Sequence, residues 1–189
     1  MPRITLIGYR GCGKSTVAAL LACRLGIPWH DADAVLEERV GLSIAAIVRE
    51  RGEPVFRDLE AELLAGLLGG EPCVLATGGG VVLRPGNRDL LREHGRPIVW
   101  LTAPAEVVRA RLAADPTTAA RRPGLSGEDP LAEVAETLAA REPLYRGCAD
   151  AVFDTARDPP ERLADAIVAW LERWDAAARS GTAAPESSA

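Results

Sequence analysis

Lysine is almost absent from this chain of 189 residues. Lysine and arginine together number 22, against 27 acidic residues, and Lys14 is the single lysine. The resulting net charge of −5 disfavours a protein that binds nucleic acid through a broad basic surface. Because arginine supplies every other positive side chain, Lys14 indicates a site that needs a compact ammonium on a flexible stem rather than a planar guanidinium.

Paired cysteines and long apolar runs are missing as well. The scattered cysteines form no C-x-x-C pair and have no histidine at ligand spacing: Cys12, Cys23, Cys73 and Cys148. This pattern argues against a zinc site and against a disulfide-rich secreted domain. The first apolar run, residues 4–7, is too short for a signal peptide, and the longest uncharged stretch, residues 72–83, is shorter than the ~20 residues that cross a bilayer. We therefore expect a cytoplasmic protein with reduced thiols and no membrane or nucleic-acid partner.

Short apolar runs alternate with longer helical patterns along the chain. Strands are expected at residues 4–8, 28–31, 73–77, 98–101 and 151–154. Helices are expected at residues 14–25, 34–40, 43–50, 53–68, 87–94, 104–113, 131–141 and 159–174. Such alternation predicts a three-layer α/β/α fold with a five-stranded parallel sheet between helices. We expect one domain over residues 1–175, a mobile Gly- and Pro-rich loop at about 113–129, and a disordered tail at 176–189.

Residues 8–15, GYRGCGKS, match the pattern G-x-x-x-x-G-K-[ST] between an expected strand and an expected helix. In this P-loop the backbone N–H groups surround phosphate oxygens, and the helix N-terminus adds positive potential. We expect Lys14 to reach the β- and γ-phosphates, Ser15 to bind Mg²⁺ and Thr16 to lie near the α-phosphate. The full set of expected nucleotide contacts in the loop is Gly11, Cys12, Gly13, Lys14, Ser15 and Thr16.

Several classes of protein share a P-loop, and the rest of the chain separates them. A switch GTPase needs an N-K-x-D motif, which a chain with one lysine cannot contain. A motor-type ATPase usually has a hydrophobic strand that ends in aspartate, whereas the strand at 73–77 is followed by Gly78-Gly79-Gly80. A small phosphotransferase therefore fits best.

Two carboxylates follow the second expected strand. At a period of two residues Asp31 and Asp33 point to the same side, at the edge of a parallel sheet where ligands bind. One could lie near Mg²⁺ and the other at the acceptor hydroxyl. The alternative is that Asp33 only caps the helix expected from residue 34.

A glycine run and several arginines complete the candidate site. Gly78-Gly79-Gly80 lets a ligand approach the backbone closely, although a flexible turn would look the same. Arg57 could simply contact Glu60 at i,i+3, and Arg141 could simply end a helix, where a cation is favourable. The adjacent arginines of the loop, Arg121 and Arg122, could be solvated.

In this order and spacing the motifs closely resemble those of the shikimate kinases, from about residue 4 to residue 174. The shared motifs are the P-loop, Asp31-Ala32-Asp33, residues 52–57 (GEPVFR), residues 77–80 (TGGG), Arg122-Pro123 and residues 141–146 (REPLYR). The resemblance implies a P-loop fold like that of nucleoside monophosphate kinases. It also implies an Mg²⁺-dependent transfer of phosphate from ATP to the 3-hydroxyl of shikimate, a step in the biosynthesis of chorismate and the aromatic amino acids. The products would be shikimate 3-phosphate and ADP, and we expect a monomer.

The resemblance also implies roles for single residues. Asp33 would bind the hydroxyls of shikimate and act as the base, with Lys14 and Arg122 as the other catalytic residues. The carboxylate of shikimate would be bound by Arg57 and Arg141, and the backbone amide of Gly79 would also contact the substrate. Ser15 and Asp31 would serve Mg²⁺, Arg122 would also contact the nucleotide phosphates, and Arg157 would lie near the adenine.

Two departures from the family pattern concern the loop. The family usually has Arg-Pro-Leu-Leu there, and this chain has Arg122-Pro123-Gly124-Leu125. The preceding stretch, residues 113–120, is also longer than usual. The choice between Arg121 and Arg122 therefore stays open. Two alternative functions remain. A related kinase for gluconate or a nucleoside monophosphate would not need Arg57 and Arg141 together. An ATP-binding regulatory module without catalytic activity would be expected to lack Lys14 or Asp33.

Overall fold

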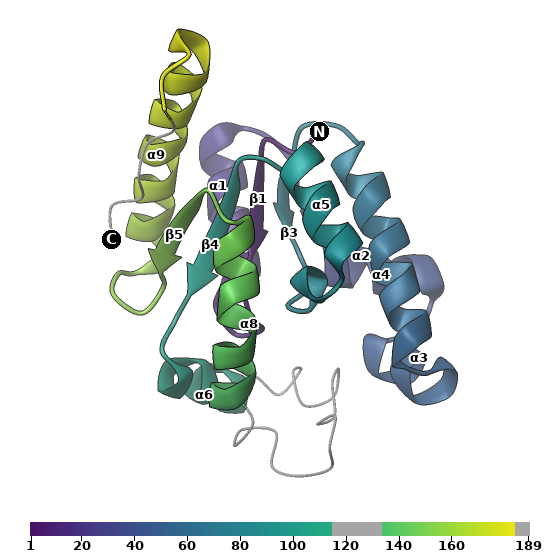
Figure 1. Cartoon of the computed structure of the whole chain (residues 1–189). Helices are drawn as coiled ribbons and strands as arrows, with labels where there is room; N and C mark the ends of the chain where they lie inside the picture. Colours follow the sequence, from purple (N-terminus) through teal and green to yellow (C-terminus); the bar gives the residue numbers. More distant parts are fainter. Residues whose placement is uncertain (115–133, 184–189) are drawn as a thin grey trace.

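A parallel sheet lies at the centre of the structure, a computed structural model that describes residues 1–114 and 134–183 (Figure 1). Within these residues five strands pair in the order β2-β3-β1-β4-β5. Their bounds are β1 (Ile4–Ile7), β2 (Trp29–Asp31), β3 (Val74–Ala76), β4 (Ile98–Thr102) and β5 (Ala151–Asp154). All four residues of β1 are buried, as expected for a strand covered on both faces. The predicted fold class is confirmed.

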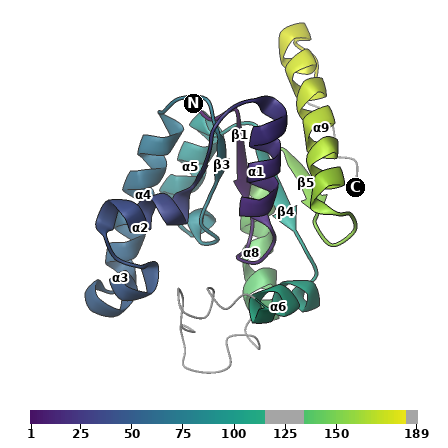
Figure 2. The ribbon, with the colours of Figure 1, turned by 180° about the vertical axis from the view of Figure 1, so that it is seen from behind.

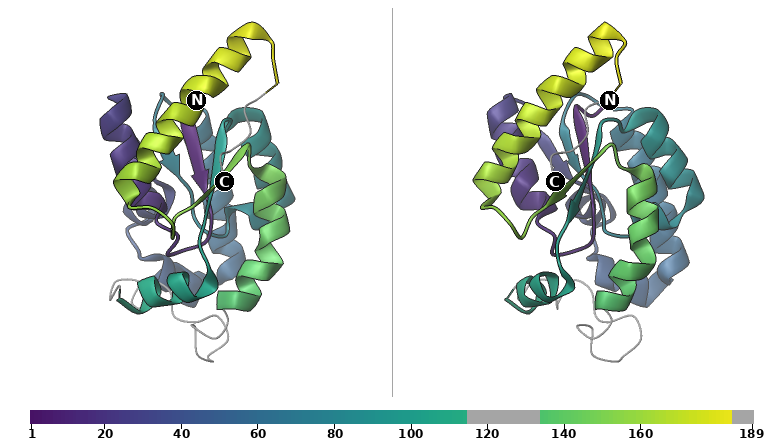
Figure 3. Two further views of the ribbon diagram at one scale, coloured as in Figure 1. Left: turned by 90° about the vertical axis from the view of Figure 1, so that its left-hand side faces the viewer. Right: turned by 60° about the vertical axis from the view of Figure 1, so that its left-hand side comes forward.

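Helices cover both faces of the sheet (Figures 2 and 3). Their bounds are α1 (Lys14–Leu25), α2 (Ala32–Val40), α3 (Ile44–Arg51), α4 (Glu53–Leu68), η1 (Val81–Leu83), α5 (Pro85–His94), α6 (Ala105–Ala114), α8 (Val134–Cys148) and α9 (Pro160–Ser180). On one face α1 and α9 pack against side chains such as Leu6 and Phe153. On the other face Ile7 and Trp100 contribute to a second core with α4, α5 and α8.

A smaller apolar cluster holds α2, α3 and α4 together, and these helices lie at one side of the molecule (Figure 1). It consists of Leu36, Ile44, Ile47, Phe56 and Leu63. Ser43 caps α3 by accepting a hydrogen bond from the N–H of Ala46 at 3.2 Å. Because the cluster fixes Phe56, it also fixes the neighbouring Arg57 at the start of α4.

Two expected helix ends are wrong. The helix expected to end at residue 141 continues as α8 to Cys148, with Pro143 inside it. Burial of Tyr145 and Cys148 holds these last turns in place despite the proline. The tail expected at 176–189 is helical as far as Ser180, since the alanines at 176–178 favour a helix and Gly181 ends it in a left-handed conformation.

Some expectations fall outside the described residues. These are the loop at 115–129 with Arg121 and Arg122, the first residues of the helix expected at 131–141, and the end of the tail at 184–189. Within the part of the chain that the structure describes, no helix is long and apolar enough to cross a membrane.

Candidate active site

A cavity of about 490 Å³ opens at the carboxyl ends of the strands, next to the start of α1. Its walls come from the P-loop, the segment after β2, the glycine run, α6 and the segment after β5. The lining residues used below are Arg10, Gly11, Gly13, Lys14, Ser15, Thr16, Asp31, Asp33, Gly79, Arg111, Thr155 and Pro160. The structure therefore brings most of the predicted P-loop contacts and both aspartates to one cavity.

The P-loop has the backbone that its glycines allow. Gly8 has φ 143°, and a β-carbon there would overlap with the carbonyl oxygen of Leu101. Gly13 is left-handed and is the N-cap of α1. Lys14 is buried, and its ammonium donates to the carbonyl oxygens of Gly8 at 2.8 Å and Tyr9 at 3.0 Å. The third N–H of the ammonium donates to Sγ of Cys12 at 3.8 Å, and because sulfur is a weak acceptor a phosphate oxygen could take its place.

Asp31, not Asp33, is the cap of α2. One oxygen of Asp31 accepts hydrogen bonds from the N–H groups of Asp33 at 3.0 Å and Ala34 at 3.4 Å. Its other oxygen accepts a hydrogen bond from the hydroxyl of Ser15 at 2.5 Å. The helix begins at Ala32 rather than at residue 34, so the expectation of a strand-like alternation through Asp33 is wrong, because the cap turns the chain into a helix first. Both carboxylates nevertheless line the cavity.

The oxygens of Ser15 and Asp31 suit Mg²⁺, which prefers hard oxygen ligands. Asp31 keeps its capping bonds on one oxygen and turns the other to Ser15, so this pair presents two such oxygens beside the P-loop. Among the described residues no three acidic, histidine or cysteine side chains are grouped so that they could hold a metal ion by themselves. Phosphate oxygens and water would have to complete the coordination of Mg²⁺ here.

Asp33 and Arg57 lie on either end of the glycine run. A β-carbon at Gly78 would lie 2.6 Å from Oδ1 of Asp33, and one at Gly80 would overlap with the guanidinium of Arg57. Larger residues at these two positions would displace both side chains. The run is therefore a close-fitting wall between a carboxylate and a guanidinium rather than a flexible turn.

Arg57 makes the i,i+3 contact considered above and an i,i+4 contact besides. Its guanidinium pairs with Glu60 at 2.9 Å and with Glu53 at 3.0 Å. Burial alone would lower the pKa of Arg57, but the carboxylates of Glu60 and Glu53 outweigh it and raise that pKa. Three of its five N–H groups are used in these contacts, which leaves two for a ligand.

Arg141 and Tyr145 hold the middle of the glycine run from α8. The guanidinium of Arg141 donates to the carbonyl oxygen of Gly79 at 3.2 Å, and the hydroxyl of Tyr145 donates to the same oxygen. Burial raises the pKa of the Tyr145 hydroxyl, so it stays a donor. Arg141 thus lies in the middle of α8 and beside the candidate site, not at a helix end.

Arg157 is not among the residues that line the cavity. Its side chain is 67% exposed and pairs with Asp154 at 3.2 Å. Arg111 lines the cavity instead, although no motif pointed to it. Its guanidinium donates to the hydroxyl and to the carbonyl oxygen of Thr155, both at 2.8 Å, which fixes it next to Gly11.

Comparison with known proteins agrees with this arrangement. The family model described as "Shikimate kinase" matches residues 10–172. The chain is 45% identical over 165 residues to a shikimate kinase of Rhodopirellula baltica, covering 87% of this chain and 88% of that one. The chain belongs to the shikimate kinase family.

Other members of the shikimate kinase family support the same assignment. A shikimate kinase of Nitratidesulfovibrio vulgaris is 49% identical over 143 residues, which cover 76% of this chain and 81% of that one. The solved structure of shikimate kinase from Acinetobacter baumannii in complex with shikimate matches with a TM-score of 0.80 and 35% identity, over 87% of this chain and 89% of that one. Both the sequence and the fold thus identify a kinase of this family.

Proposed function

We propose that the chain transfers the γ-phosphoryl group of ATP to the 3-hydroxyl of shikimate, giving shikimate 3-phosphate and ADP. Membership of the shikimate kinase family carries this proposal. The observation in the site that supports it is the gathering of Asp33, Arg57 and Arg141 around one glycine run that faces the P-loop.

The P-loop side of the cavity suits a nucleotide. Lys14 offers a donor to the phosphates, and the N–H groups at the start of α1 add positive potential. Ser15 and Asp31 would hold Mg²⁺, whose charge would offset that of the transferring phosphoryl group. Arg111 of α6 and Pro160 at the start of α9 bound the space left for the nucleoside.

The glycine-run side suits a small hydroxylated anion, with Asp33 and Gly79 lining the cavity and Arg57 and Arg141 lying next to the glycine run but outside the lining. Arg57 and Arg141 each keep unused N–H donors, and guanidinium groups bind carboxylates through paired hydrogen bonds. Two such guanidinium groups would bind one carboxylate of the substrate, and Asp33 would accept a hydrogen bond from one of its hydroxyls. Neither gluconate nor a nucleoside monophosphate presents a ring carboxylate and ring hydroxyls together.

Phosphoryl transfer passes through a loose transition state with charge spread over the phosphoryl oxygens, so alignment and neutralisation contribute most of the catalysis. In this site Lys14 neutralises charge, and Asp33 orients the acceptor hydroxyl and accepts its proton. We also propose that the enzyme works as a cytoplasmic monomer.

An acceptor assay tests the proposed function directly. Purified protein with Mg²⁺ and ATP should produce ADP with shikimate and show at most background rates with quinate, gluconate or AMP. The phosphorylated product should carry its phosphate on the 3-hydroxyl by ³¹P and ¹H NMR. Faster turnover of gluconate or AMP than of shikimate would contradict the proposal.

Arg141→Met should weaken shikimate binding while leaving ATP binding nearly unchanged. A charge-assisted hydrogen bond contributes about 1.5–3 kcal/mol, so the KM for shikimate should rise roughly 10- to 100-fold. Tyr145 still holds the Gly79 carbonyl in this variant, which keeps the glycine run in place. Arg57 is less suitable for this test because its removal would leave the buried Glu60 without its ion-pair partner.

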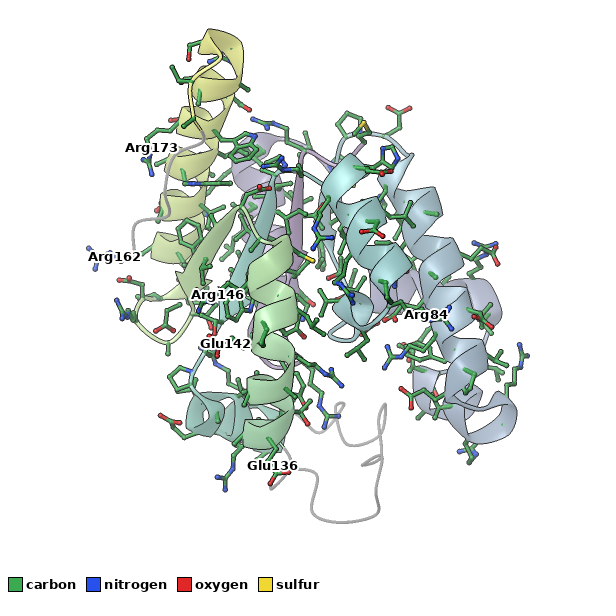
Figure 4. All side chains as sticks on the ribbon, in the orientation of Figure 1. Arg84, Glu136, Glu142, Arg146, Arg162 and Arg173 are labelled. Carbon is green, nitrogen blue, oxygen red and sulfur yellow. The ribbon has the colours of Figure 1, made fainter. Side chains whose placement is uncertain are left out.

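Arg146→Met is the matched control on the same helix. Arg146 pairs with Glu142 and lies over the ring of Trp100, and Figure 4 shows Arg146 and Glu142 together on α8. Steady-state kinetics with each substrate varied in turn should show normal KM values for this control. Loss of ATP affinity with normal shikimate affinity in Arg141→Met would overturn the role of Arg141.

A further inference from the structure

Arg10 occupies a P-loop position whose residue type the motif does not specify, and it is one of the residues that line the cavity. The side chain is half-buried, and its guanidinium lies 5.7 Å from the centre of the Tyr9 ring. Its Nε is buried and has no hydrogen-bond partner among the described residues. Its Nη1 and Nη2 likewise make no hydrogen bond to a described residue and are not among the buried atoms, so their N–H groups are the donors that a ligand in the cavity could use.

The backbone places Arg10 where the two halves of the site meet. A β-carbon at Gly79 would lie 3.0 Å from the backbone nitrogen of Arg10, so the P-loop touches the glycine run here. The ammonium of Lys14 donates to the carbonyl oxygen of Tyr9, which belongs to the peptide unit that leads into Arg10. Arg10 therefore lies between the phosphate side and the acceptor side.

The charge around Arg10 is also unbalanced. Arg57 and Arg96 pair with carboxylates, whereas Arg10 has no ion pair with any residue that the structure describes. The guanidinium of Arg141 lies 5.5 Å from the centre of the same Tyr9 ring. Two guanidinium groups lie against one aromatic ring, and neither has an ion pair with a carboxylate in residues 1–114 or 134–183, so this region favours an anion.

We propose that Arg10 is a further catalytic residue, which binds the phosphoryl group during transfer and keeps hold of it as the phosphate of the product. The proposal rests on the function proposed above. In that reaction a bond forms between the acceptor oxygen and the γ-phosphorus while the bond to the bridging oxygen of ADP breaks. ADP leaves with the electron pair, and the hydroxyl proton passes to Asp33. Arg10 gives and takes no proton; it neutralises the oxygens of the group in transit.

The position of Arg10 favours the phosphoryl group over the substrate carboxylate as its ligand. Arg10 belongs to the loop that carries Lys14, and Lys14 approaches the same peptide unit. Arg141 and Arg57, the expected ligands of the carboxylate, come from α8 and α4. Because Arg10 lies between the phosphate side and the acceptor side, it is expected to contact the phosphoryl group as it passes from ATP to the acceptor.

Arg10→Met tests the proposal because it keeps an apolar stem against Tyr9 and removes the charge. Arg173→Met is the matched control, since Arg173 is an exposed residue on α9 (Figure 4) and is not among the residues that line the cavity. Binding of shikimate, of the Mg²⁺ complex of a non-hydrolysable ATP analogue, and of shikimate 3-phosphate is measured by calorimetry, and kcat by ADP release. Turnover of shikimate by the unaltered enzyme is established first, so failure of the proposed function would be seen independently of Arg10.

In Arg10→Met we expect kcat to fall about 100-fold and the Kd of shikimate 3-phosphate to rise about tenfold. The Kd values of shikimate and of the ATP analogue should stay within about twofold, as in the control. Arg10→Lys should recover part of the product affinity, which a role in packing against Tyr9 alone would not explain, and it provides a second variant if Arg10→Met folds poorly. Unchanged kcat and product affinity would overturn the proposal. So would an equal loss of affinity for shikimate and its phosphate, because Arg10 would then bind the carboxylate.

Discussion

Lys14→Arg is expected to lower kcat at least about 1,000-fold although it keeps the positive charge. The ammonium of Lys14 is buried and fits between the carbonyl oxygens of Gly8 and Tyr9, with the sulfur of Cys12 at 3.8 Å. A planar guanidinium is wider and cannot donate to both carbonyls and a phosphate oxygen from that position. The measurement is kcat at saturating shikimate and ATP.

Lys14→Met and the surface variant Arg173→Lys are the companion variants. The methionine variant should lose as much activity as Lys14→Arg, and Arg173→Lys should have normal kcat. Thermal unfolding should show a modest decrease in Tm for both Lys14 variants, since each loses hydrogen bonds that order the loop. If Lys14→Arg kept more than a tenth of the normal kcat, a positive charge alone would suffice at this position. The inference that the site needs an ammonium, drawn from the single lysine of the chain, would then be wrong.

Local sequence patterns predicted the P-loop half of the site well. The bounds of α1 and α4 agree with the expected helices at 14–25 and 53–68. The residues of the loop itself are contiguous in the motif, so the spacing places their backbone, whereas Asp31, Arg111 and Pro160 reach this half from distant segments. The glycines then determine the shape of the loop, as at Gly8.

Contacts between distant segments could not be predicted in this way. Arg111 is held by Thr155, and Tyr145 donates to Gly79, pairs separated by 44 and 66 residues. No motif contains both members of either pair, so no spacing rule relates them. The end of α8 was missed for the same reason, because packing of Tyr145 against Trp100, with ring centres 5.8 Å apart, outweighs the local effect of Pro143.

Which of the two aspartates, Asp31 or Asp33, caps α2 could not be predicted from the sequence. Either aspartate could have capped a helix that starts one or two residues later. The structure shows that Asp31 accepts both capping hydrogen bonds. Asp33 is therefore not needed as a cap, which makes its effects on activity and on stability separable by experiment.

Asp33→Asn is expected to lower kcat roughly 10²- to 10⁴-fold, the usual contribution of a positioned acid or base. Its Tm should stay within about 2 °C of the unaltered enzyme, because the cap of α2 is intact. Asp31→Asn is the matched control for folding: asparagine caps as well as aspartate, so this variant should also keep its Tm. Its defect should appear as a higher Mg²⁺ requirement, since an amide is a weaker ligand for Mg²⁺ than a carboxylate.

A third variant separates the two roles that Asp33 could have in transfer. Asparagine still offers an oxygen that accepts a hydrogen bond from the acceptor hydroxyl, but it cannot take up the proton, whereas alanine can do neither. If proton uptake by Asp33 matters, Asp33→Asn and Asp33→Ala should lose kcat to within about tenfold of each other. Retention of most of the normal kcat in Asp33→Asn, together with a large loss in Asp33→Ala, would show that Asp33 only orients the hydroxyl. In that case the proton leaves with the phosphoryl group or to water, as the loose transition state permits.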